Sequence, residues 1–232
     1  MIPGTLNRNS RTGLGGSPAP PSPRGLVEHI LVGGLPRCGS SLTMQMLDAG
    51  GMRVFGSFPS YEGDVDVAEL AGAWRALEEP HVIKVIDPLA MVAVKIEIPP
   101  ASRVIWLCRD FEQQARSQIK FFRASTPGLR IDAKRARGKL LQSLRTDTFK
   151  SLEMLGLHLG YARSDRDLSG RVLRVNFETL IARPAETASL FAGFLGRPDL
   201  DIERMARQVR KRGPEARARL LEYELVAAGG IL

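Results

Sequence analysis

The sequence is poor in cysteine and has no long apolar run. Its 232 residues contain only two cysteines, Cys38 and Cys108, which are too few for the disulfide framework of a small secreted protein. No apolar stretch reaches the roughly 20 residues that a membrane-spanning helix needs. The first residues also lack the apolar core of a signal peptide. We therefore expect a cytoplasmic protein that is not inserted in a membrane.

Positive charge is in excess. The chain has 33 Lys and Arg against 25 Asp and Glu, for a net charge of +8. Such an excess is typical of proteins that bind nucleic acid, an anionic membrane or an anionic small molecule, and by itself it does not distinguish among them. The hydrophobic content of 44% and the charged content of 25% are ordinary for a globular protein.

The chain divides into a tail and one domain. Residues 1–25 are rich in Gly, Pro, Ser and Asn, and such a segment cannot bury enough apolar surface to offset its loss of conformational entropy. We expect a disordered tail at 1–25 and a single domain at 26–232. In this domain, apolar runs of strand length alternate with helical patterns, which predicts an α/β fold with a central parallel sheet flanked by helices. The expected strands are 29–32, 52–55, 81–86, 103–108 and 171–177.

Residues 29–51, HILVGGLPRCGSSLTMQMLDAGG, read as a strand, a tight glycine-rich turn and a helix. Such a turn presents backbone N–H groups at a helix N-terminus, where they bind phosphate or sulfate. Gly34 and Gly39 have the spacing of the Walker loop GxxxxGK[ST], but Ser40 stands where the lysine belongs. This departure argues against an ATPase or a kinase, while Arg37 supplies a cation inside the loop. The alternative is an ordinary strand–turn–helix corner without a ligand.

The string PRCGSS resembles the P-[KR]-x-G-[ST]-[ST] loop of sulfotransferases that use 3′-phosphoadenosine 5′-phosphosulfate (PAPS). The longer string GLPRCGSSLTMQMLDAGG is similar to bacterial members of that family. The resemblance implies a transferase of P-loop-like fold that needs no metal, with PAPS as the donor and adenosine 3′,5′-bisphosphate (PAP) as the product. It also implies that the 5′-phosphosulfate is held by Arg37, Cys38, Gly39, Ser40, Ser41 and Leu42.

The family's second signature binds the 3′-phosphate. It consists of an arginine at the end of a strand and a serine eight positions later on the next helix, and RVIWLCRDFEQQARSQIKFF places Arg109 and Ser117 at that separation. A guanidinium can bind phosphate oxygens in a forked geometry while a hydroxyl donates from the helix. Alternatively, Arg109 caps the sheet edge and Ser117 is a solvated helix position.

Two later segments carry looser resemblances. VLRVNFETLIARPAETASLFAGFLG is similar to a late strand, turn and helix of the family, which implies that Phe177 approaches the adenine. Arg210, Lys211, Arg212 and Gly213 resemble a basic element that closes over the 3′-phosphate, although a solvated basic helix end explains them as well. The similarity spans roughly residues 30–213, and its specific motifs are the two phosphate signatures.

Transfer of a sulfuryl group places negative charge on the leaving oxygen, so it needs cations near the sulfate and a base for the acceptor. Arg37 occupies the family's catalytic cation position. Lys84 ends a predicted strand and could reach the sulfuryl group from the other side, or it could extend its ammonium group to solvent.

The base is less well marked. Many family members have a histidine two positions after the strand lysine, where this chain has Ile86. Other branches use a glutamate on the loop after the second strand, and Glu62 lies in that place. Asp87 is the reserve, and a solvated loop carboxylate is the alternative for Glu62.

These residues follow the ends of different strands, and in parallel sheets ligands bind beyond the carboxyl ends of the strands. The sequence thus predicts a PAPS-dependent sulfotransferase that acts on a hydroxyl or amine of a small-molecule or glycan acceptor. It does not identify the acceptor, whose pocket we expect near residues 55–66 and 123–140. The alternatives are a P-loop kinase or another phosphate-binding enzyme and, third, a basic nucleic-acid-binding protein.

Overall fold

A four-stranded parallel sheet forms the centre of the computed structural model, which describes residues 27–61, 69–126, 132–158 and 170–209. The strands are β1 (His29–Gly34), β2 (Val82–Ile86), β3 (Ala101–Cys108) and β4 (Val172–Asn176), and they lie in the order β2-β1-β3-β4. All three neighbouring pairs are parallel. The predicted α/β architecture is therefore confirmed.

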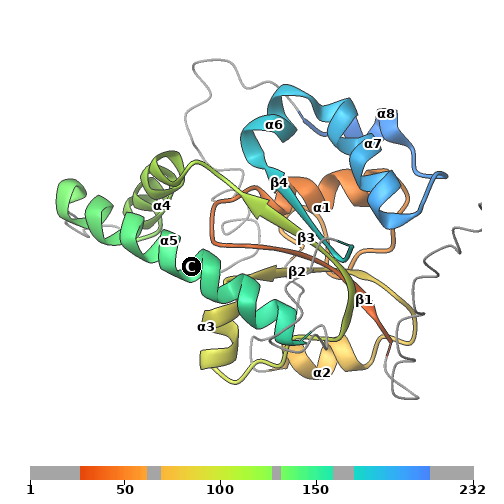
Figure 1. Ribbon diagram of the computed structural model, residues 1–232, viewed down its shortest axis with the longest axis horizontal. Helices are drawn as coiled ribbons and strands as arrows, with labels where there is room; N and C mark the ends of the chain where they lie inside the picture. The colour runs from red at the N-terminus through yellow and green to blue at the C-terminus, as the bar shows by residue number, and fades with distance from the viewer. Residues whose placement is uncertain (1–26, 62–68, 127–131, 159–169, 210–232) are drawn as a thin grey trace, which may run out of the picture.

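Helices cover both faces of the sheet (Figure 1). One face carries α1 (Ser40–Ala49), α6 (Phe177–Ala182), α7 (Pro184–Leu195) and α8 (Ile202–Arg207). The opposite face carries α2 (Leu70–Arg75), α3 (Pro88–Ala93) and α5 (Ala133–His158). The remaining helix of the described residues, α4 (Phe111–Ser125), follows β3 and packs beside α5.

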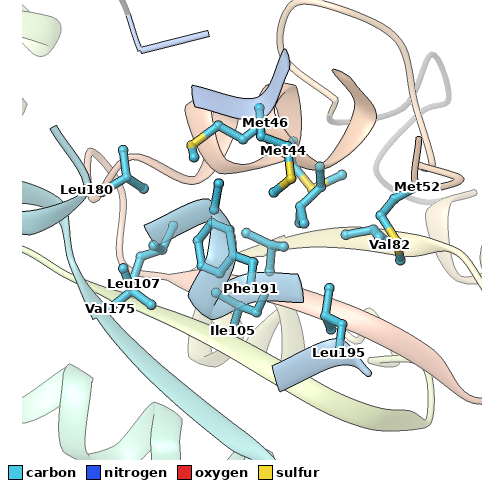
Figure 2. Packing of buried hydrophobic residues seen from close by; sticks show 14 of the residues in the cluster. Met44, Met46, Met52, Val82, Ile105, Leu107, Val175, Leu180, Phe191 and Leu195 are labelled. Carbon is cyan, nitrogen blue, oxygen red and sulfur yellow. The ribbon is translucent and has the colours of Figure 1, made fainter. Parts of the chain in front are cut away.

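Alternation of side chains along the strands explains the two layers. Leu31 and Val32 are both buried but belong to opposite clusters, as do Ile105 and Trp106. Strands of this kind are buried on both faces, which is why they read as nearly continuous apolar runs. Figure 2 shows the cluster that contains Val32 and Ile105, in which Phe191 of α7 lies over the sheet.

Several expected boundaries differ from the structure. Residues 52–55 make only an isolated bridge, Val54 to Val82, because the segment pairs with the start of β2 and then turns away. The sequence pattern at 123–137 predicts a basic loop that leads into a long helix, but much of this segment is helical, since α4 continues to Ser125 and α5 begins at Ala133. The carboxylate of Asp132 caps α5 by accepting from the N–H groups of Lys134 and Arg135, at 3.0 and 3.1 Å. Phe177 begins α6 and does not end β4.

The sequence pattern predicts a helix from Pro184 to Leu195 that Gly196 ends, and α7 confirms it, with Gly196 in the left-handed conformation. The sequence pattern at 89–98 allows either a helix or a strand, and in the structure α3, which begins at Pro88, continues into this segment as far as Ala93. The predicted tail at 1–25 lies outside the described residues, and so do residues 215–227, whose sequence pattern predicts a helix.

Candidate functional site

The glycine-rich loop between β1 and α1 has the geometry of an anion-binding turn. Gly39 precedes α1 with φ 102°, and Arg37 adopts φ 72°, so the chain reverses sharply before the helix begins. In the part of the chain that the structure describes, no side chain caps α1, and its first turn holds no acidic residue. The backbone N–H groups of that turn are therefore available to phosphate or sulfate oxygens.

The loop packs tightly against the end of β3. A Cβ atom at Gly34 would lie 2.5 Å from Cys38 Sγ and 2.9 Å from the carbonyl oxygen of Leu107, so only glycine fits there. Cys38 is 1% exposed, and burial raises the pKa of its thiol to about 11. Cys38 therefore belongs to the loop's packing, and its thiol stays protonated near neutral pH.

Arg37 lies between the loop and α4. Its Nε donates to Ser117 Oγ at 3.1 Å, and its guanidinium carbon is 5.4 Å from the centre of the Phe121 ring. Arg109 Nη1 in turn donates to the carbonyl oxygen of Arg37 at 3.0 Å. The structure thus joins the two signatures that the sequence proposed separately, because Arg37 contacts both Arg109 and Ser117.

Two glutamines that the sequence analysis missed also hold this loop. Gln114 Nε2 donates to the carbonyl oxygens of Leu35 and Pro36 at 3.2 and 2.9 Å, and Gln118 Nε2 donates to that of Pro36 at 3.0 Å. Both glutamines are buried. Their spacing of four residues places them on one face of α4. The only signal in the sequence was this pair of polar residues on the face that also carries apolar Ala115 and Ile119.

Arg109 lies at the end of β3 with its guanidinium packed on an aromatic ring. Its guanidinium carbon is 4.6 Å from the centre of the Phe177 ring, a cation–π distance. Its Nε is buried and has no hydrogen-bond partner among the described residues. Burial lowers the pKa of Arg109, an effect that neighbouring Glu178 opposes. A buried guanidinium donor without a partner fits an anionic ligand.

Phe177 lies between the two predicted phosphate sites. Besides stacking on Arg109, its ring packs so closely on the loop that a Cβ at Gly39 would be 2.4 Å from Cδ2. The next residue, Glu178, accepts from the backbone N–H of Asp110 at 3.2 Å. The start of α6 therefore braces both the glycine-rich loop and the start of α4.

Lys84 contacts the other side of the loop. It is 5% exposed, and its Nζ donates to Ser41 Oγ at 2.9 Å and to the carbonyl oxygen of Ser60 at 2.7 Å. The alternative of an ammonium group extended to solvent is therefore wrong. Lys84 links the first turn of α1 to the segment that precedes the predicted base.

That segment is held at three points. Tyr61 Oη donates to Asp48 Oδ2 at 2.6 Å, Gln45 Nε2 donates to the carbonyl oxygen of Pro59 at 3.3 Å, and Lys84 holds Ser60. Glu62, the predicted base, follows Tyr61 in the sequence and lies outside the described residues. Residues Arg210 to Gly213 also lie outside them.

The reserve base, Asp87, has a structural contact of its own. It follows β2 with φ 48°, and its Oδ1 accepts from the N–H of Ala90 at 3.2 Å, which caps α3. Burial raises the pKa of the Asp87 carboxyl group, and neighbouring Asp147 adds to the shift. The capping bond turns this carboxylate toward α3, whereas Lys84 contacts α1.

Two other kinds of feature are absent from the described residues. These residues contain no group of three or more His, Cys, Asp and Glu side chains that could hold a metal ion. None of their helices combines the length and the apolar character that crossing a membrane requires.

Comparison with solved structures identifies the fold of the chain. The crystal structure of mouse sulfotransferase SULT7A1 complexed with PAP matches the chain with a TM-score of 0.51 and 14% sequence identity. The chain has a P-loop-like sulfotransferase fold. The match covers 79% of this chain and spans 64% of the length of the mouse chain. No family model matches the sequence, and no curated protein matches it.

Proposed function

We propose that this chain transfers a sulfuryl group from PAPS to a hydroxyl or amine of an acceptor. The observation that carries the proposal is the contact of Arg37 with both Arg109 and Ser117. It brings the two phosphate signatures together at the carboxyl end of the sheet, where parallel α/β folds bind ligands. The fold shared with a PAP-bound sulfotransferase supports the same assignment.

The residues fit the two phosphates of the nucleotide. We assign the 5′-phosphosulfate to the loop and the first turn of α1, where Arg37, Cys38, Gly39, Ser40, Ser41 and Leu42 are found. We assign the 3′-phosphate to Arg109 and Ser117, because Arg109 Nε is a buried donor without a partner in the described residues. Phe177, which packs on Gly39 and Arg109, would contact the nucleotide between these two ends.

Two cations would stabilise the charge that develops during transfer. Lys84 Nζ already lies 2.9 Å from Ser41 Oγ, so it is held beside the turn that would bind the sulfate. Arg37 is held on the other side by Ser117. Cations fixed in place before the reaction cost no reorganisation when the S–O bond breaks. We assign both to charge stabilisation, and we keep Glu62 as the proposed base for the acceptor's proton, in a mechanism without metal.

Binding of PAP, measured by thermal shift, tests the proposal without knowledge of the acceptor. A ligand that binds only the folded state raises the melting temperature, so PAP should stabilise the protein in the absence of magnesium. A P-loop kinase would instead be stabilised by magnesium and ATP and would hydrolyse ATP. Stabilisation by ATP with magnesium but not by PAP would contradict the proposal.

We also infer a cytoplasmic location. Cys38 and Cys108 are both free thiols, and this state is typical of proteins kept in a reducing compartment.

A further inference from the structure

One face of α4 contacts the glycine-rich loop along two helical turns. Gln114, Ser117, Gln118 and Phe121 follow one another at i, i+3, i+4 and i+7, the spacing of a single helix face. All four contact residues 35–37 of the loop. The proposed function uses Ser117 as a ligand of the 3′-phosphate, but it gives no role to Phe121.

These contacts divide between the backbone and a side chain of the loop. The buried amides of Gln114 and Gln118 donate to the carbonyl oxygens of the two residues before Arg37. Arg37 itself has φ 72°, in the left-handed region that residues other than glycine seldom adopt. Its side chain extends to Ser117 and Phe121. Both the backbone that leads to Arg37 and its guanidinium group are therefore held by α4.

Ser117 and Phe121 restrain different parts of this guanidinium group. Ser117 Oγ accepts from Nε at 3.1 Å, which restrains the direction of the Nε–H bond. The guanidinium carbon lies over the Phe121 ring, 5.4 Å from its centre, which is within the range of cation–π attraction. The ring thus restrains the position of the charged carbon, which a single hydrogen bond to Nε leaves free to swing.

This pair of contacts suits an arginine better than a lysine. A guanidinium has five N–H donors in a planar fork, so Nε can bind Ser117 while Nη1 and Nη2 serve another group. A lysine would have a single nitrogen for the serine, the ring and the sulfuryl group. The face of α4 therefore favours the arginine that the loop carries at position 37.

We propose, on the basis of the proposed function, that Phe121 is a positioning residue that holds Arg37 for charge stabilisation during transfer. The ring attracts the cation but carries no negative charge that would compete with the sulfuryl oxygens. A cation held in place before the reaction costs no reorganisation when negative charge develops. Phe121 acts through Arg37, and only Arg37 contacts the sulfuryl group.

Hydrolysis of PAPS tests this role without a known acceptor. Water attacks the sulfur, the S–O bond to the 5′-phosphate breaks, PAP and sulfate are released, and the two protons of water pass to the solvent. Phe121→Leu keeps an apolar side chain but removes the ring. It should lower kcat about five- to tenfold, the effect of a partly desolvated cation–π contact. KM for PAPS and Kd for PAP should change little, because the contact acts in the transition state.

A double-mutant cycle shows whether Phe121 acts through Arg37. In the Arg37→Gln background, Phe121→Leu should change kcat by less than about twofold, because the ring has no cation to hold. Phe121→Tyr keeps an aromatic ring and should retain most of the wild-type kcat. Phe149→Leu, which replaces an exposed phenylalanine of α5, is the matched control and should leave kcat unchanged.

The Nε–H signal of Arg37 in ¹H–¹⁵N spectra reports on its position without turnover. Its absence from the Arg37→Gln spectrum assigns it. In the wild type it should exchange slowly with water, because Ser117 accepts from it. In Phe121→Leu it should exchange faster although Ser117 is intact. If the wild type binds PAP but does not hydrolyse PAPS measurably, this signal alone decides.

Three results would overturn this inference and leave the proposed function intact. They are a kcat of Phe121→Leu equal to or above that of the wild type, an equal loss in the Arg37→Gln background, and unchanged exchange of the Arg37 Nε–H. A loss of PAP affinity in Phe121→Leu would assign the ring to the nucleotide and would also contradict the inference. Failure of the wild-type protein to bind PAP would instead contradict the proposed function.

Discussion

Arg37 and Ser117 are 80 residues apart in the sequence and are joined by a hydrogen bond of 3.1 Å from Nε to Oγ. This bond holds the loop's only cation against α4, the helix that carries the serine of the second phosphate signature. It fixes the direction of the Arg37 side chain before any ligand binds, which is the preorganisation that an anion site requires.

The first prediction concerns this bond. Ser117→Ala removes the acceptor of Arg37 Nε and one proposed phosphate ligand, so PAP affinity should fall by about 1.5–3 kcal/mol, the usual contribution of a hydrogen bond to a charged group. Isothermal titration calorimetry measures this change. Gln113→Ala, on the exposed side of the same helix, is the matched control. Equal affinities of the Ser117→Ala variant and the wild type would remove Ser117 from the site.

The second prediction separates steric contact from backbone strain in the loop. Gly39 and Gly51 have similar φ angles, 102° and 98°, but a Cβ at Gly39 meets Phe177 at 2.4 Å whereas one at Gly51 meets nothing within 4 Å. Both Gly→Ala changes should destabilise the protein through strain. Gly39→Ala should cost about 1–3 kcal/mol more because of overpacking, as measured by urea denaturation.

Phe177→Ala tests the origin of that difference. When Phe177 is already alanine, Gly39→Ala should lower the free energy of unfolding by little more than Gly51→Ala does. The reason is that the ring that the new methyl group would meet is gone. A Gly39→Ala variant as stable as Gly51→Ala would contradict the packing of Phe177 on the loop.

The third prediction concerns the two thiols. Cys38 is 1% exposed with its pKa raised to about 11, while Cys108 is only partly buried. Because the thiolate is the reactive form, iodoacetamide at pH 8 should modify Cys108 first and leave Cys38 almost unmodified in the folded protein. Mass spectrometry of the digested protein identifies the labelled residue. Modification of Cys38 faster than Cys108 would contradict the burial of the Cys38 thiol in the loop.

The fourth prediction is a loss of stability in mild acid. His29 is buried, and its Nδ1 accepts from the backbone N–H of His81 at 3.2 Å. Burial lowers the pKa of His29, and His81 adds to the shift; burial and Arg53 lower that of His81. The unfolded chain, whose histidines titrate near pH ~6.5, therefore binds more protons as the pH falls. The stabilisation is complete above that pH and is lost as the pH falls through the lowered folded values.

The melting temperature should thus decrease from pH 7.5 to pH 5.5. Asp87 opposes this trend at the acid end, because its raised pKa favours the folded state when the carboxyl group is protonated. His29→Asn keeps an acceptor for the His81 N–H but cannot be protonated, so it should reduce the decrease. An identical decrease in wild type and variant would assign the pH dependence to other groups.

The sequence predicted the site best where all residues of a motif belong to one strand and the turn and helix that follow it. The loop from Gly34 to Ser41 and the pair Arg109 and Ser117 are each set by a strand, a turn and a helix, so their spacing alone predicted their place at the sheet edge. The length of the apolar runs predicted the buried strands for the same reason.

Contacts between distant segments were not predictable. Gln114 and Gln118 bind the loop through side-chain amides, and polar helix residues carry no mark that separates this role from exposure to solvent. The contact of Lys84 with Ser60 depends on a loop path that no local pattern specifies. The capping role of Asp87 could have been predicted, since an Asp followed by Pro88 is a known helix start.

The most direct test of the proposed function is a calorimetric comparison of PAP with AMP, which lacks the 3′-phosphate. Wild-type protein should bind PAP more tightly than AMP, and Arg109→Gln should cost PAP about 2–4 kcal/mol, the range for breaking a buried charge pair, while AMP affinity changes little. Arg53→Gln, an exposed arginine that pairs with Glu79, is the control. Equal affinities for PAP and AMP, or a preference for PAP that survives Arg109→Gln, would contradict the assignment of the 3′-phosphate to Arg109.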